Sequence, residues 1–366
     1  MKFTIQQSTL LQALLITGKA IGKSASLPLL ENYRFKIDGN SLEISGFNLQ
    51  VFISKKLKIA GEDGQTDIAI PAGKLLDLIK ELPNQPLEFT ISHTKSLTIK
   101  ADCGTYTYPI ESGVDFPLIV NKPEVMFYIN SEDLLTGLEK SIFSCSSDQV
   151  IPLSGVLISL ENSAVTYTGC NGNILSTISF ESPSDAVCKC IVPVRPLTIL
   201  QGMDFDKLIK VSLDTKAIEF KIDDDTIIKT MLFDGKYPDY KAIIPKSNDK
   251  TLVMSRADLI GCLKRVTLFA DNKQKEVLID LNVLACNISS QMDDGEMANE
   301  SIVHTYSGDE IKIKVNGRNL MSCLNKISSE EVTFKLSKYN KPVLLLEAGE
   351  EDKVDGNLML IMPLVV

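Results

Sequence analysis

The sequence predicts an α+β protein made of three tandem copies of one domain, each with two helices packed on antiparallel sheets. Strand–helix segments recur at intervals of about 120 residues along the 366-residue chain. Between them, apolar and polar residues alternate with the period of two that half-buried strands require. Three near-equal domains also suit this length. We expect them at 1–123, 124–248 and 249–366.

The first recurring segment is a short strand followed by a helix. Its three copies read FTIQQSTLLQAL, FYINSEDLLTGL and LVMSRADLIGCL, and they place three leucines in register: Leu10, Leu134 and Leu259. Apolar residues at i, i+1 and i+4 predict helices at 8–23, 131–142 and 255–268. Ser8, Ser131 and Ser255 are predicted N-caps, because a serine hydroxyl accepts a hydrogen bond from a free N–H of the first turn.

A second strand–helix segment follows in each repeat. Its copies read IAIPAGKLLDLI, CIVPVRPLTIL and IKVNGRNLMSCL. Pro71 and Pro193 stand at the joint between strand and helix, where a missing N–H costs little. This pattern predicts three more helices at 72–82, 193–203 and 316–327.

The stretches between these helices read as strands. Clear cases are LEFTI at 87–91, IEFKI at 218–222 and VTFKL at 332–336. Turn formers such as Asp38-Gly39-Asn40 separate the runs. Helices are therefore the minority of each repeat, which makes the class α+β.

Composition is that of a soluble globular protein. The formal charge is −9, with 44% apolar and 23% charged residues. The longest apolar run is far below the ~18 residues of a membrane span. The N-terminal residues lack the apolar core of a signal peptide, so we expect a cytoplasmic protein.

Several kinds of catalytic and cofactor site are disfavoured. The eight cysteines are scattered, and the closest pair, Cys188 and Cys190, is not a CxxC motif. His93 and His304 are the only histidines, which gives no support for a His-based metal site or a Ser-His-Asp triad. Neither GxGxxG nor GxxxxGK[ST] occurs. We expect no catalytic residues, no cofactor and no metal.

The charge is unevenly distributed. The six predicted helices contain eleven basic and six acidic residues, a net charge of +5, which leaves −14 on the rest of the chain. Lys74, Arg195 and Arg318 recur near the start of the second helix of each repeat. These side chains either face solvent with no special role or form a surface that holds a phosphate backbone without reading its sequence. The charge alone leaves both interpretations open.

The segment LFDGKYPDYKAIIP at 232–245 resembles the segment that closes the middle domain of the bacterial DNA polymerase III beta subunits, the beta sliding clamps. The resemblance extends along the whole chain. It includes MKFTI at the start, Leu27-Pro28, Asp115-Phe116-Pro117, TYSG at 305–308 and the final LMLIMPLVV. The threefold repeat and the six helices agree with it independently.

The resemblance implies a non-catalytic clamp in which three copies of the DNA-clamp fold occur per chain. Two chains join head to tail, domain 1 to domain 3, in a homodimeric ring that encircles duplex DNA without sequence preference. Such a ring tethers the replicative polymerase, the clamp loader and other proteins with clamp-binding motifs, and it confers processivity in DNA replication. The residues expected to face DNA are Lys19, Lys23, Lys74, Arg195, Arg256, Lys264, Arg265 and Arg318. Those expected at the dimer interface are Tyr106 and Tyr108 of one chain with Leu268 and Phe269 of the other.

The resemblance also implies a cleft between domains 2 and 3 that binds a glutamine-led peptide ending in leucine or phenylalanine. The positions that match this cleft are Leu153, Cys170, Gly172, Asn173, Ile174, Leu175, Pro238, Ile243, Pro342, Leu360, Met362, Pro363 and Leu364. Ile174, Ala242 and Val365 stand where basic residues are frequent in the family, and Asn173 replaces a histidine. We therefore expect a less positive cleft, with a partner motif that differs in detail.

Two other classes of function compete with the clamp interpretation. A hydrolase with a carboxylate-bound metal would use the acidic runs at 223–225 or 293–294, but these runs lack a fixed partner spacing and fit solvated hairpin tips. An acidic repeat-domain scaffold would make no contact with DNA. A ring retained on circular DNA but lost from linear DNA distinguishes a clamp from such a scaffold.

Overall fold

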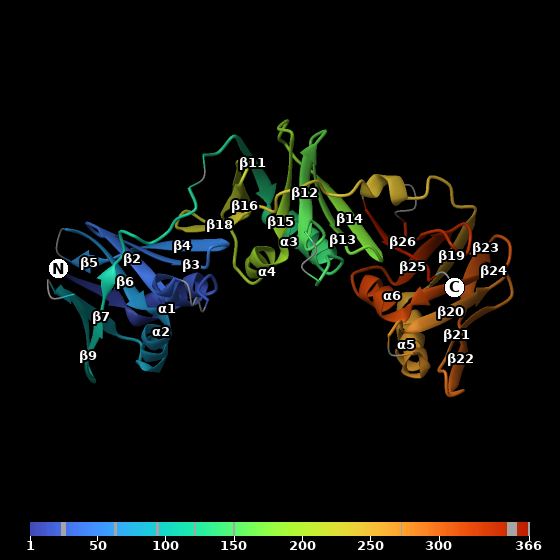
Figure 1. Ribbon diagram of the computed structural model, residues 1–366, viewed down its shortest axis with the longest axis horizontal. Helices are drawn as coiled ribbons and strands as arrows, with labels where there is room; N and C mark the ends of the chain where they lie inside the picture. The colour runs from blue at the N-terminus through green and yellow to red at the C-terminus, as the bar shows by residue number, and fades with distance from the viewer. Residues whose placement is uncertain are drawn as a thin grey trace. The chain divides into compact units, whose positions relative to one another are not determined.

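The computed structural model describes residues 1–22, 27–61, 64–92, 95–120, 122–148, 151–271, 273–349 and 357–364 (Figure 1). The chain divides into two compact units. Unit 1 comprises Met1–Glu132 and Ile199–Leu232, and unit 2 comprises Asp133–Thr198 and Phe233–Val366. The expected domain limits at 123/124 and 248/249 stay a prediction. In the described ranges, no helix is long and apolar enough to cross a membrane.

The predicted α+β class is confirmed. Six α-helices lie within the described ranges: α1 (Gln7–Gly18), α2 (Ala72–Glu81), α3 (Ser131–Ile142), α4 (Val194–Gln201), α5 (Arg256–Val266) and α6 (Gly317–Leu324). Three 3-10 helices accompany them: η1 (Pro28–Glu31), η2 (Tyr240–Ile243) and η3 (Thr267–Phe269). The predicted helix at 8–23 is too long. It ends at Gly18 in a tight turn, where the Ala20 N–H donates to the Thr17 carbonyl at 3.1 Å.

One of the three predicted serine caps is confirmed. The Ser255 hydroxyl accepts a hydrogen bond from the Asp258 N–H at 3.3 Å. Ser131 is instead the first residue of α3, and the side chain of Asn130 accepts the bond from the Glu132 N–H at 2.9 Å. Ser8 lies inside α1, which begins one residue earlier at Gln7. An asparagine caps a helix as well as a serine does, so the pattern located the helix start without fixing the capping residue.

Unit 1 contains two antiparallel sheets. The five-stranded sheet has the order β5-β1-β7-β8-β9, with β1 (Lys2–Gln6), β5 (Ala60–Gly61), β7 (Pro86–Ser92), β8 (Ser96–Ala101) and β9 (Gly104–Pro109). The nine-stranded sheet has the order β10-β6-β2-β3-β4-β18-β17-β16-β11. Its strands are β2 (Asn32–Asp38), β3 (Ser41–Phe47), β4 (Val51–Lys58), β6 (Gln65–Pro71), β10 (Glu111–Ser112), β11 (Val125–Asn130), β16 (Leu208–Leu213), β17 (Ala217–Lys221) and β18 (Thr226–Met231).

The core of unit 1 forms where α1 and α2 pack against both sheets. Leu14 of α1 and Leu75 of α2 are fully buried in one cluster with Phe35 of the nine-stranded sheet and Phe89 of the five-stranded sheet. This arrangement explains the sequence pattern, because a helix with one apolar stripe and a strand with one apolar face must bury them together.

Unit 2 repeats this arrangement. Its nine-stranded sheet has the order β15-β12-β13-β14-β27-β26-β25-β19-β23, and its four-stranded sheet has the order β22-β21-β20-β24. The strands are β12 (Gly155–Glu161), β13 (Ala164–Cys170), β14 (Ile174–Glu181), β15 (Cys188–Pro193), β19 (Lys250–Ser255), β20 (Glu276–Leu281), β21 (Cys286–Gln291), β22 (Met297–Ser301), β23 (His304–Ser307), β24 (Ile311–Asn316), β25 (Glu331–Leu336), β26 (Val343–Glu347) and β27 (Leu358–Ile361). Leu263 of α5 and Leu320 of α6 are buried with Phe334 and Ile288 of the two sheets.

The helix α3 lies close to its sheet because of a glycine. A Cβ on Gly137 would come within 2.4 Å of the Tyr167 ring on β13. Any larger side chain at this position would push the helix away from the buried tyrosine.

Each nine-stranded sheet joins two repeats by one antiparallel strand pair. We call the pairing of β4 with β18 junction 1; it runs from Val51 opposite Thr230 to Lys55 opposite Thr226. We call the pairing of β14 with β27 junction 2; it runs from Ile174 opposite Ile361 to Thr177 opposite Leu358. Junction 1 lies within unit 1, and junction 2 lies within unit 2.

Candidate partner-binding cleft

One face of the nine-stranded sheet of unit 2 carries a cluster of apolar side chains at junction 2, which we call the cleft cluster. Its buried members are Leu157, Cys170, Leu175, Ile191, Tyr237, Leu344, Leu346, Leu358 and Leu360. Alternate positions, such as 344 with 346 and 358 with 360, point to the same side of their strands. The cluster therefore spans neighbouring strands and forms a continuous apolar face. Five further members are only partly buried: Leu153, Phe233, Tyr240, Ile244 and Met362.

The segment that leads from β18 to β19 lies over this face and is anchored by Tyr237. That side chain is only 8% exposed, and its hydroxyl donates to the Thr168 carbonyl at 3.4 Å. Burial raises the pKa of the Tyr237 phenol well above its usual range, so it stays neutral. Pro238 and Ile243 remain exposed on the same segment.

A tight turn between β13 and β14 closes one end of the cleft cluster. The Asn171 side-chain oxygen accepts bonds from the N–H groups of Asn173 at 2.9 Å and Ile174 at 2.8 Å. Gly172 has a φ of 87°, a conformation that favours glycine. The Asn173 carbonyl accepts from the Met362 N–H at 2.8 Å, which fixes the C-terminal segment beside the turn.

The structure brings part of the predicted cleft set together. Leu153, Cys170, Leu175, Leu360 and Met362 all belong to the cleft cluster. The residues that flank it without joining it are Gly172 and Asn173 in the turn, Pro238 and Ile243 on the connecting segment, Pro342 before β26, and Pro363 and Leu364 after β27. The placement of these residues as ligands stays a prediction.

Ile174 is placed differently from its neighbour Leu175. It is 3% exposed and packs in the core that contains α5 and α6, together with Ile361. The reason is the strand period of two, which sends successive residues to opposite faces. An isoleucine suits that interior position. Val365, another position where the family often has a basic residue, lies outside the described residues.

Several cleft members were missed by the sequence reasoning. Leu344, Leu346 and Leu358 line the face, and Tyr240 and Ile244 lie at its edge. The alternation of VLLLE and LMLI allowed a prediction of which residues share a face. It could not indicate which face the 233–248 segment would cover.

Two thiols, Cys170 in the cleft cluster and Cys145 near it, are uncharged at neutral pH. Burial raises the pKa of the Cys145 thiol to about 12, and burial also raises the pKa of the Cys170 thiol. The Cys145 thiol donates to the Gly155 carbonyl at 3.5 Å. Neutral thiols with high pKa values behave as small apolar groups rather than nucleophiles.

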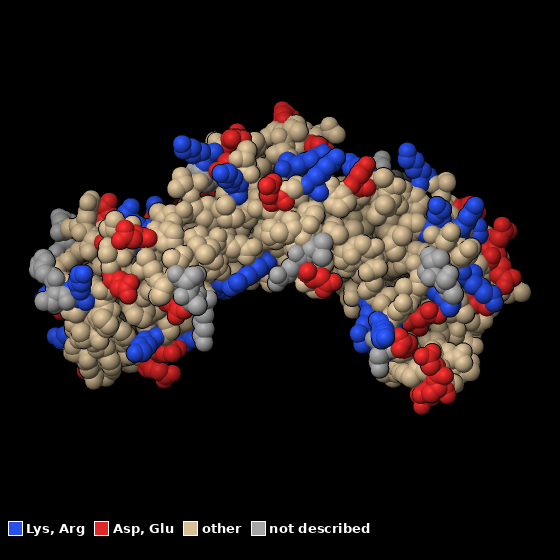
Figure 2. All heavy atoms as spheres, viewed as in Figure 1, with Lys and Arg blue, Asp and Glu red and all other residues tan. Residues whose placement is uncertain are grey.

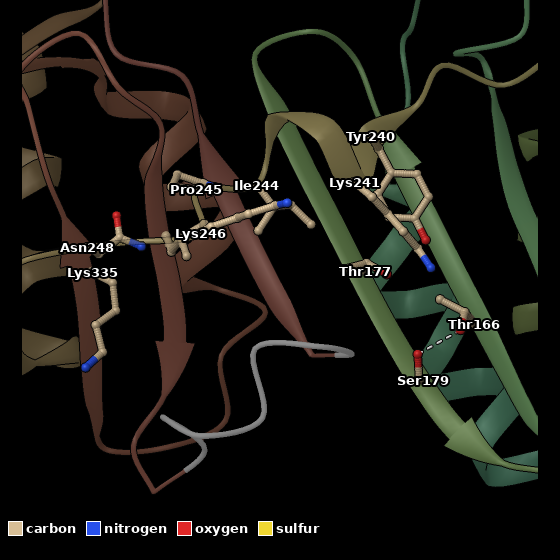
Figure 3. Close-up of a pocket in the computed structure, with 11 residues that line it drawn as sticks. Thr166, Thr177, Ser179, Tyr240, Lys241, Ile244, Pro245, Lys246, Asn248 and Lys335 are labelled. Carbon is tan, nitrogen blue, oxygen red and sulfur yellow. Dashed lines mark hydrogen bonds between the residues drawn. The ribbon is translucent and has the colours of Figure 1, made fainter. Parts of the chain in front are cut away.

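A cavity of about 710 Å³ adjoins this cluster in unit 2 (Figure 3). Tyr240, Ile244 and Leu344 belong both to the cavity wall and to the cleft cluster. The other lining residues are Thr166, Thr177, Ser179, Lys241, Pro245, Lys246, Asn248 and Lys335. Hydroxyl, amide and ammonium groups are among those that line the cavity, whereas the cleft cluster is apolar.

The residues predicted to face DNA fall into two groups. Lys74, Arg195, Lys264 and Arg318 are exposed on helices, and within the part of the chain that the structure describes they make no ion pair. Three others have protein partners. The Lys19 ammonium donates to the Gly202 carbonyl at 2.9 Å, and Arg256 donates to the Ser329 carbonyl at 3.0 Å. Arg265 forms a two-pronged pair with Glu300 at 2.8 and 2.6 Å.

The Arg265 pair lowers the charge available to DNA, since its fork holds the pKa of Glu300 below the usual range and keeps that carboxylate ionised. Lys23 lies outside the described residues. On the face seen in Figure 2, basic and acidic side chains are interspersed. The DNA-facing set therefore stays a prediction.

The residues predicted at the dimer interface lie at sheet edges or on an exposed turn. Tyr106 and Tyr108 are on β9, the terminal strand of its sheet. Leu268 is 69% exposed and Phe269 is 36% exposed on η3. The Lys275 ammonium donates to the Ala270 carbonyl at 3.1 Å, which holds this turn in place.

The acidic runs considered for a metal site are turns. The Asp223 carboxylate accepts from the N–H groups of Asp225 at 2.8 Å and Thr226 at 2.5 Å. These bonds contribute to a lowered pKa of Asp223, despite an opposing desolvation effect. The Asp294 carboxylate likewise accepts from the Glu296 N–H. Among the described residues, no group of three or more His, Cys, Asp or Glu is arranged to hold a metal.

Comparisons with known proteins agree over the whole chain. Three family models match it: the DNA polymerase III beta subunit N-terminal domain at residues 1–120, the central domain at 128–239 and the C-terminal domain at 241–363. The beta sliding clamp of Pseudomonas aeruginosa is 26% identical over 370 residues, which covers 100% of both chains. That of Pseudomonas putida is 26% identical and covers 96% of this chain and 97% of the relative.

Solved structures show the same fold. The DNA polymerase III subunit beta of Pseudomonas aeruginosa has a TM-score of 0.94 at 25% identity, with 100% of both chains covered. The beta subunit of Thermotoga maritima has a TM-score of 0.90 at 20% identity, covering 100% of this chain and 99% of the other.

Proposed function

Because this chain belongs to the family of the DNA polymerase III beta subunit, we propose that it acts through a DNA-facing helix surface, a pair of ring-closing strand edges and a partner-binding cleft. The chain is a sliding clamp, a processivity factor rather than an enzyme. It tethers the replicative polymerase and other replication proteins to duplex DNA, and this tethering requires neither a catalytic site nor a cofactor. We assign its three domains to 1–123, 124–248 and 249–366 and its location to the cytoplasm.

The ring proposal rests on the repetition of one junction. Junctions 1 and 2 begin at Val51 and Ile174, which are 123 residues apart. Another 123 residues along is Met297, the first residue of β22. This strand is terminal in the four-stranded sheet, as β9 is in the five-stranded sheet. Pairing β22 of one chain with β9 of a second chain would complete a third junction.

Such a contact joins different surfaces of the two chains, and two copies of it close a ring of two chains. Terminal strands present unpaired N–H and C=O groups, which favour this kind of pairing. The exposed side chains of Leu268 and Phe269 and the half-buried Tyr106 and Tyr108 would add apolar contact. The ring is therefore proposed as a homodimer joined head to tail.

The proposed hold on DNA is electrostatic. Lys74, Arg195, Lys264 and Arg318 supply exposed positive charge from helices of all three repeats. Contacts of this kind neutralise phosphates without reading bases, so they suit a ring that slides. Each one is weak and screened by salt, which means that no single side chain dominates.

The cleft proposal rests on one observation, the apolar face at junction 2 with a partly buried rim. A glutamine-led peptide ending in leucine and phenylalanine would bury two large side chains against Leu153, Met362 and their neighbours. Burying one such side chain contributes roughly 1.5–3 kcal/mol, so two anchors give roughly micromolar binding after ordering costs. The cluster is uncharged, so this core interaction should depend little on salt.

A topological retention assay tests the clamp as a whole. The chain, loaded onto nicked circular DNA by a clamp loader, should remain bound and should be lost when the circle is linearised. The double variant Leu268→Ala with Phe269→Ala should sediment toward the single-chain mass of 40.3 kDa and should not be retained. Val283→Ala with Leu284→Ala, exposed at 65% and 94%, is the matched control and should behave as the parent. A fully dimeric interface variant at low concentration would contradict this interface.

A further inference from the structure

We propose that the lysine-lined cavity beside the cleft cluster binds an acidic side chain of the peptide that occupies the cleft. The inference rests on the proposed partner-binding function and adds a second, charge-selective subsite to it. The ligand class is a carboxylate of Asp or Glu that flanks the apolar anchors of the partner peptide.

The side chains that line the cavity carry positive charge. Its eleven lining residues include three lysines, Lys241, Lys246 and Lys335, and no acidic residue. Lys335 donates to the Thr251 hydroxyl at 3.3 Å. Lys241 and Lys246 make no ion pair or side-chain hydrogen bond within the part of the chain that the structure describes. The cavity therefore offers two ammonium groups for an anion.

The acidic side chains nearest in sequence to these lysines or near Tyr240 are otherwise engaged or exposed. Glu161 pairs with Lys189 at 2.7 Å, and Asp249 pairs with Lys250 at 2.6 Å. Asp239 is exposed and does not line the cavity. A carboxylate supplied by a ligand would not displace any of these protein pairs.

The cavity is also furnished with hydrogen-bonding groups. Thr166 and Ser179 join their hydroxyls at 2.8 Å on neighbouring strands, and Thr177 lies beside them. Figure 3 shows Lys241 and the Tyr240 hydroxyl directed toward this strand pair, and Lys246 extending into the space between it and the Lys335 side. Lysines and hydroxyls together suit a carboxylate, which accepts several hydrogen bonds.

The side-chain amide of Asn248 favours a peptide over a free ion as the ligand of the cavity. Asn248 lines the cavity, and its side-chain oxygen is buried with no hydrogen-bond partner among the described residues. Buried polar groups are normally paired. A peptide can supply the missing N–H donor from its backbone while its carboxylate meets the lysines.

The cavity is continuous with the cleft cluster, which indicates that one peptide occupies both. Tyr240, Ile244 and Leu344 line the cavity and also belong to the cluster. An extended peptide whose apolar residues lie on the cluster would thus continue into the cavity over a few residues. Charge complementarity then favours an acidic flank over a neutral or basic one.

The test measures how much tighter an acidic peptide binds than a neutral peptide with the same core. Three fluorescent peptides share the core Gln-Leu-Ser-Leu-Phe: one neutral, one with three glutamates before the core, and one with three after it. Fluorescence polarisation with the full-length protein is run at low and high salt. One acidic peptide should bind roughly fivefold tighter than the neutral core at low salt, and high salt should remove most of this gain.

The double variant Lys241→Met with Lys246→Met should lose that gain and bind the neutral core as the parent does. Lys338→Met with Lys341→Met removes the same charge from exposed positions outside the cavity and should retain the gain. Equal gains in both double variants, or no gain with either acidic peptide, would overturn the inference. The opposing result is a single-stranded oligonucleotide that abolishes the affinity gain of the acidic peptide in the parent protein and binds only when Lys241 and Lys246 are present. That result would overturn the inference in favour of a phosphate site. Failure of the neutral core to bind the parent protein would instead contradict the proposed cleft.

Discussion

At junction 1, two phenylalanines cover the outer face of the strand pair. Phe47 and Phe52 are opposite each other on β3 and β4, and their rings meet edge to face with centroids 6.3 Å apart. Both are at most 5% exposed. The residues 123 positions later are Cys170 and Leu175, which occupy the corresponding strand positions at junction 2. The same backbone pairing therefore carries much less side-chain volume at junction 2.

The segments that cross the two junctions resemble each other in their exposure. At junction 1, Phe116 and Ile119 are 3% and 8% exposed and belong to the cluster of Phe47 and Phe52. At junction 2, Tyr237 is comparably buried, but Ile243 is 41% exposed. Each crossing segment thus buries an aromatic anchor and also leaves apolar side chains at the surface, Val114, Leu118 and Val120 at junction 1 and Ile243 at junction 2.

The difference in side-chain volume favours junction 2 over junction 1 as the proposed partner-binding site. Both junctions have an antiparallel strand pair, an apolar outer face and a crossing segment. Phe47 and Phe52 fill the face at junction 1. The smaller side chains of Cys170 and Leu175 fill less of the face at junction 2, where partly buried positions remain. A duplicated domain can therefore acquire a binding site at one junction without changing its backbone.

The largest expected effect is on the stability of junction 1. Phe47→Ala should lower the free energy of unfolding by about 3–5 kcal/mol, because it removes a buried aromatic ring and leaves a cavity. Cys170→Ala, at the corresponding position of junction 2, should cost about 1 kcal/mol or less. Urea denaturation of both variants at one protein concentration measures the contrast. Equal losses would mean that the two junctions are packed alike.

A smaller effect is expected when the volume of junction 1 is transferred to junction 2. Cys170→Phe places at the cleft the residue that junction 1 has at Phe47, so the added ring should compete with the partner peptide. Affinity for the neutral core peptide should fall at least about tenfold, a loss of roughly 1.4 kcal/mol. Fluorescence polarisation measures this loss.

The control for that variant is Val187→Phe, which adds the same ring bulk at a position that is already 69% exposed. It should bind the peptide normally. A Cys170→Phe protein that is folded by circular dichroism and still binds with parental affinity would place the partner site elsewhere.

The sequence allowed the repeat, the six helices and some of the strands to be predicted. This follows from periodicity, since residues such as Leu10, Leu134 and Leu259 repeat at a fixed spacing and all three are buried. Exact ends and caps were less predictable. Serine and asparagine cap helices almost equally well, so the choice of Asn130 over Ser131 depended on local geometry.

The candidate cleft was predicted in part, and only through the family resemblance. Alternation in the strands groups Leu358 with Leu360, yet it does not say which sheet face is outermost. Ile174 shows this limit, since it belongs to an interior core while Leu175 lies in the cleft cluster. The lysine-lined cavity escaped prediction because its walls come from segments far apart in sequence, such as 166–179 and 335–344.

The smallest expected effect concerns a charged pair on junction 1. Lys229 lies opposite Phe52 across the strand pair and forms an ion pair with Glu219 at 2.9 Å, both side chains being about one-fifth exposed. The corresponding positions at junction 2 are Leu360 and Leu344, which face each other across β27 and β26. Replacing the pair by Glu219→Leu with Lys229→Leu should change the free energy of unfolding by less than about 1 kcal/mol, since partly exposed ion pairs contribute little.

The double leucine variant should also create no peptide binding at junction 1, because Phe116 and Ile119 still cover the face. Urea denaturation measures the change in stability. Fluorescence polarisation measures peptide binding, and adding Cys170→Phe to the double leucine variant blocks the cleft at junction 2, so that any remaining binding reports on junction 1. Peptide binding gained by this double leucine variant would show that charge, and not volume, distinguishes the two junctions.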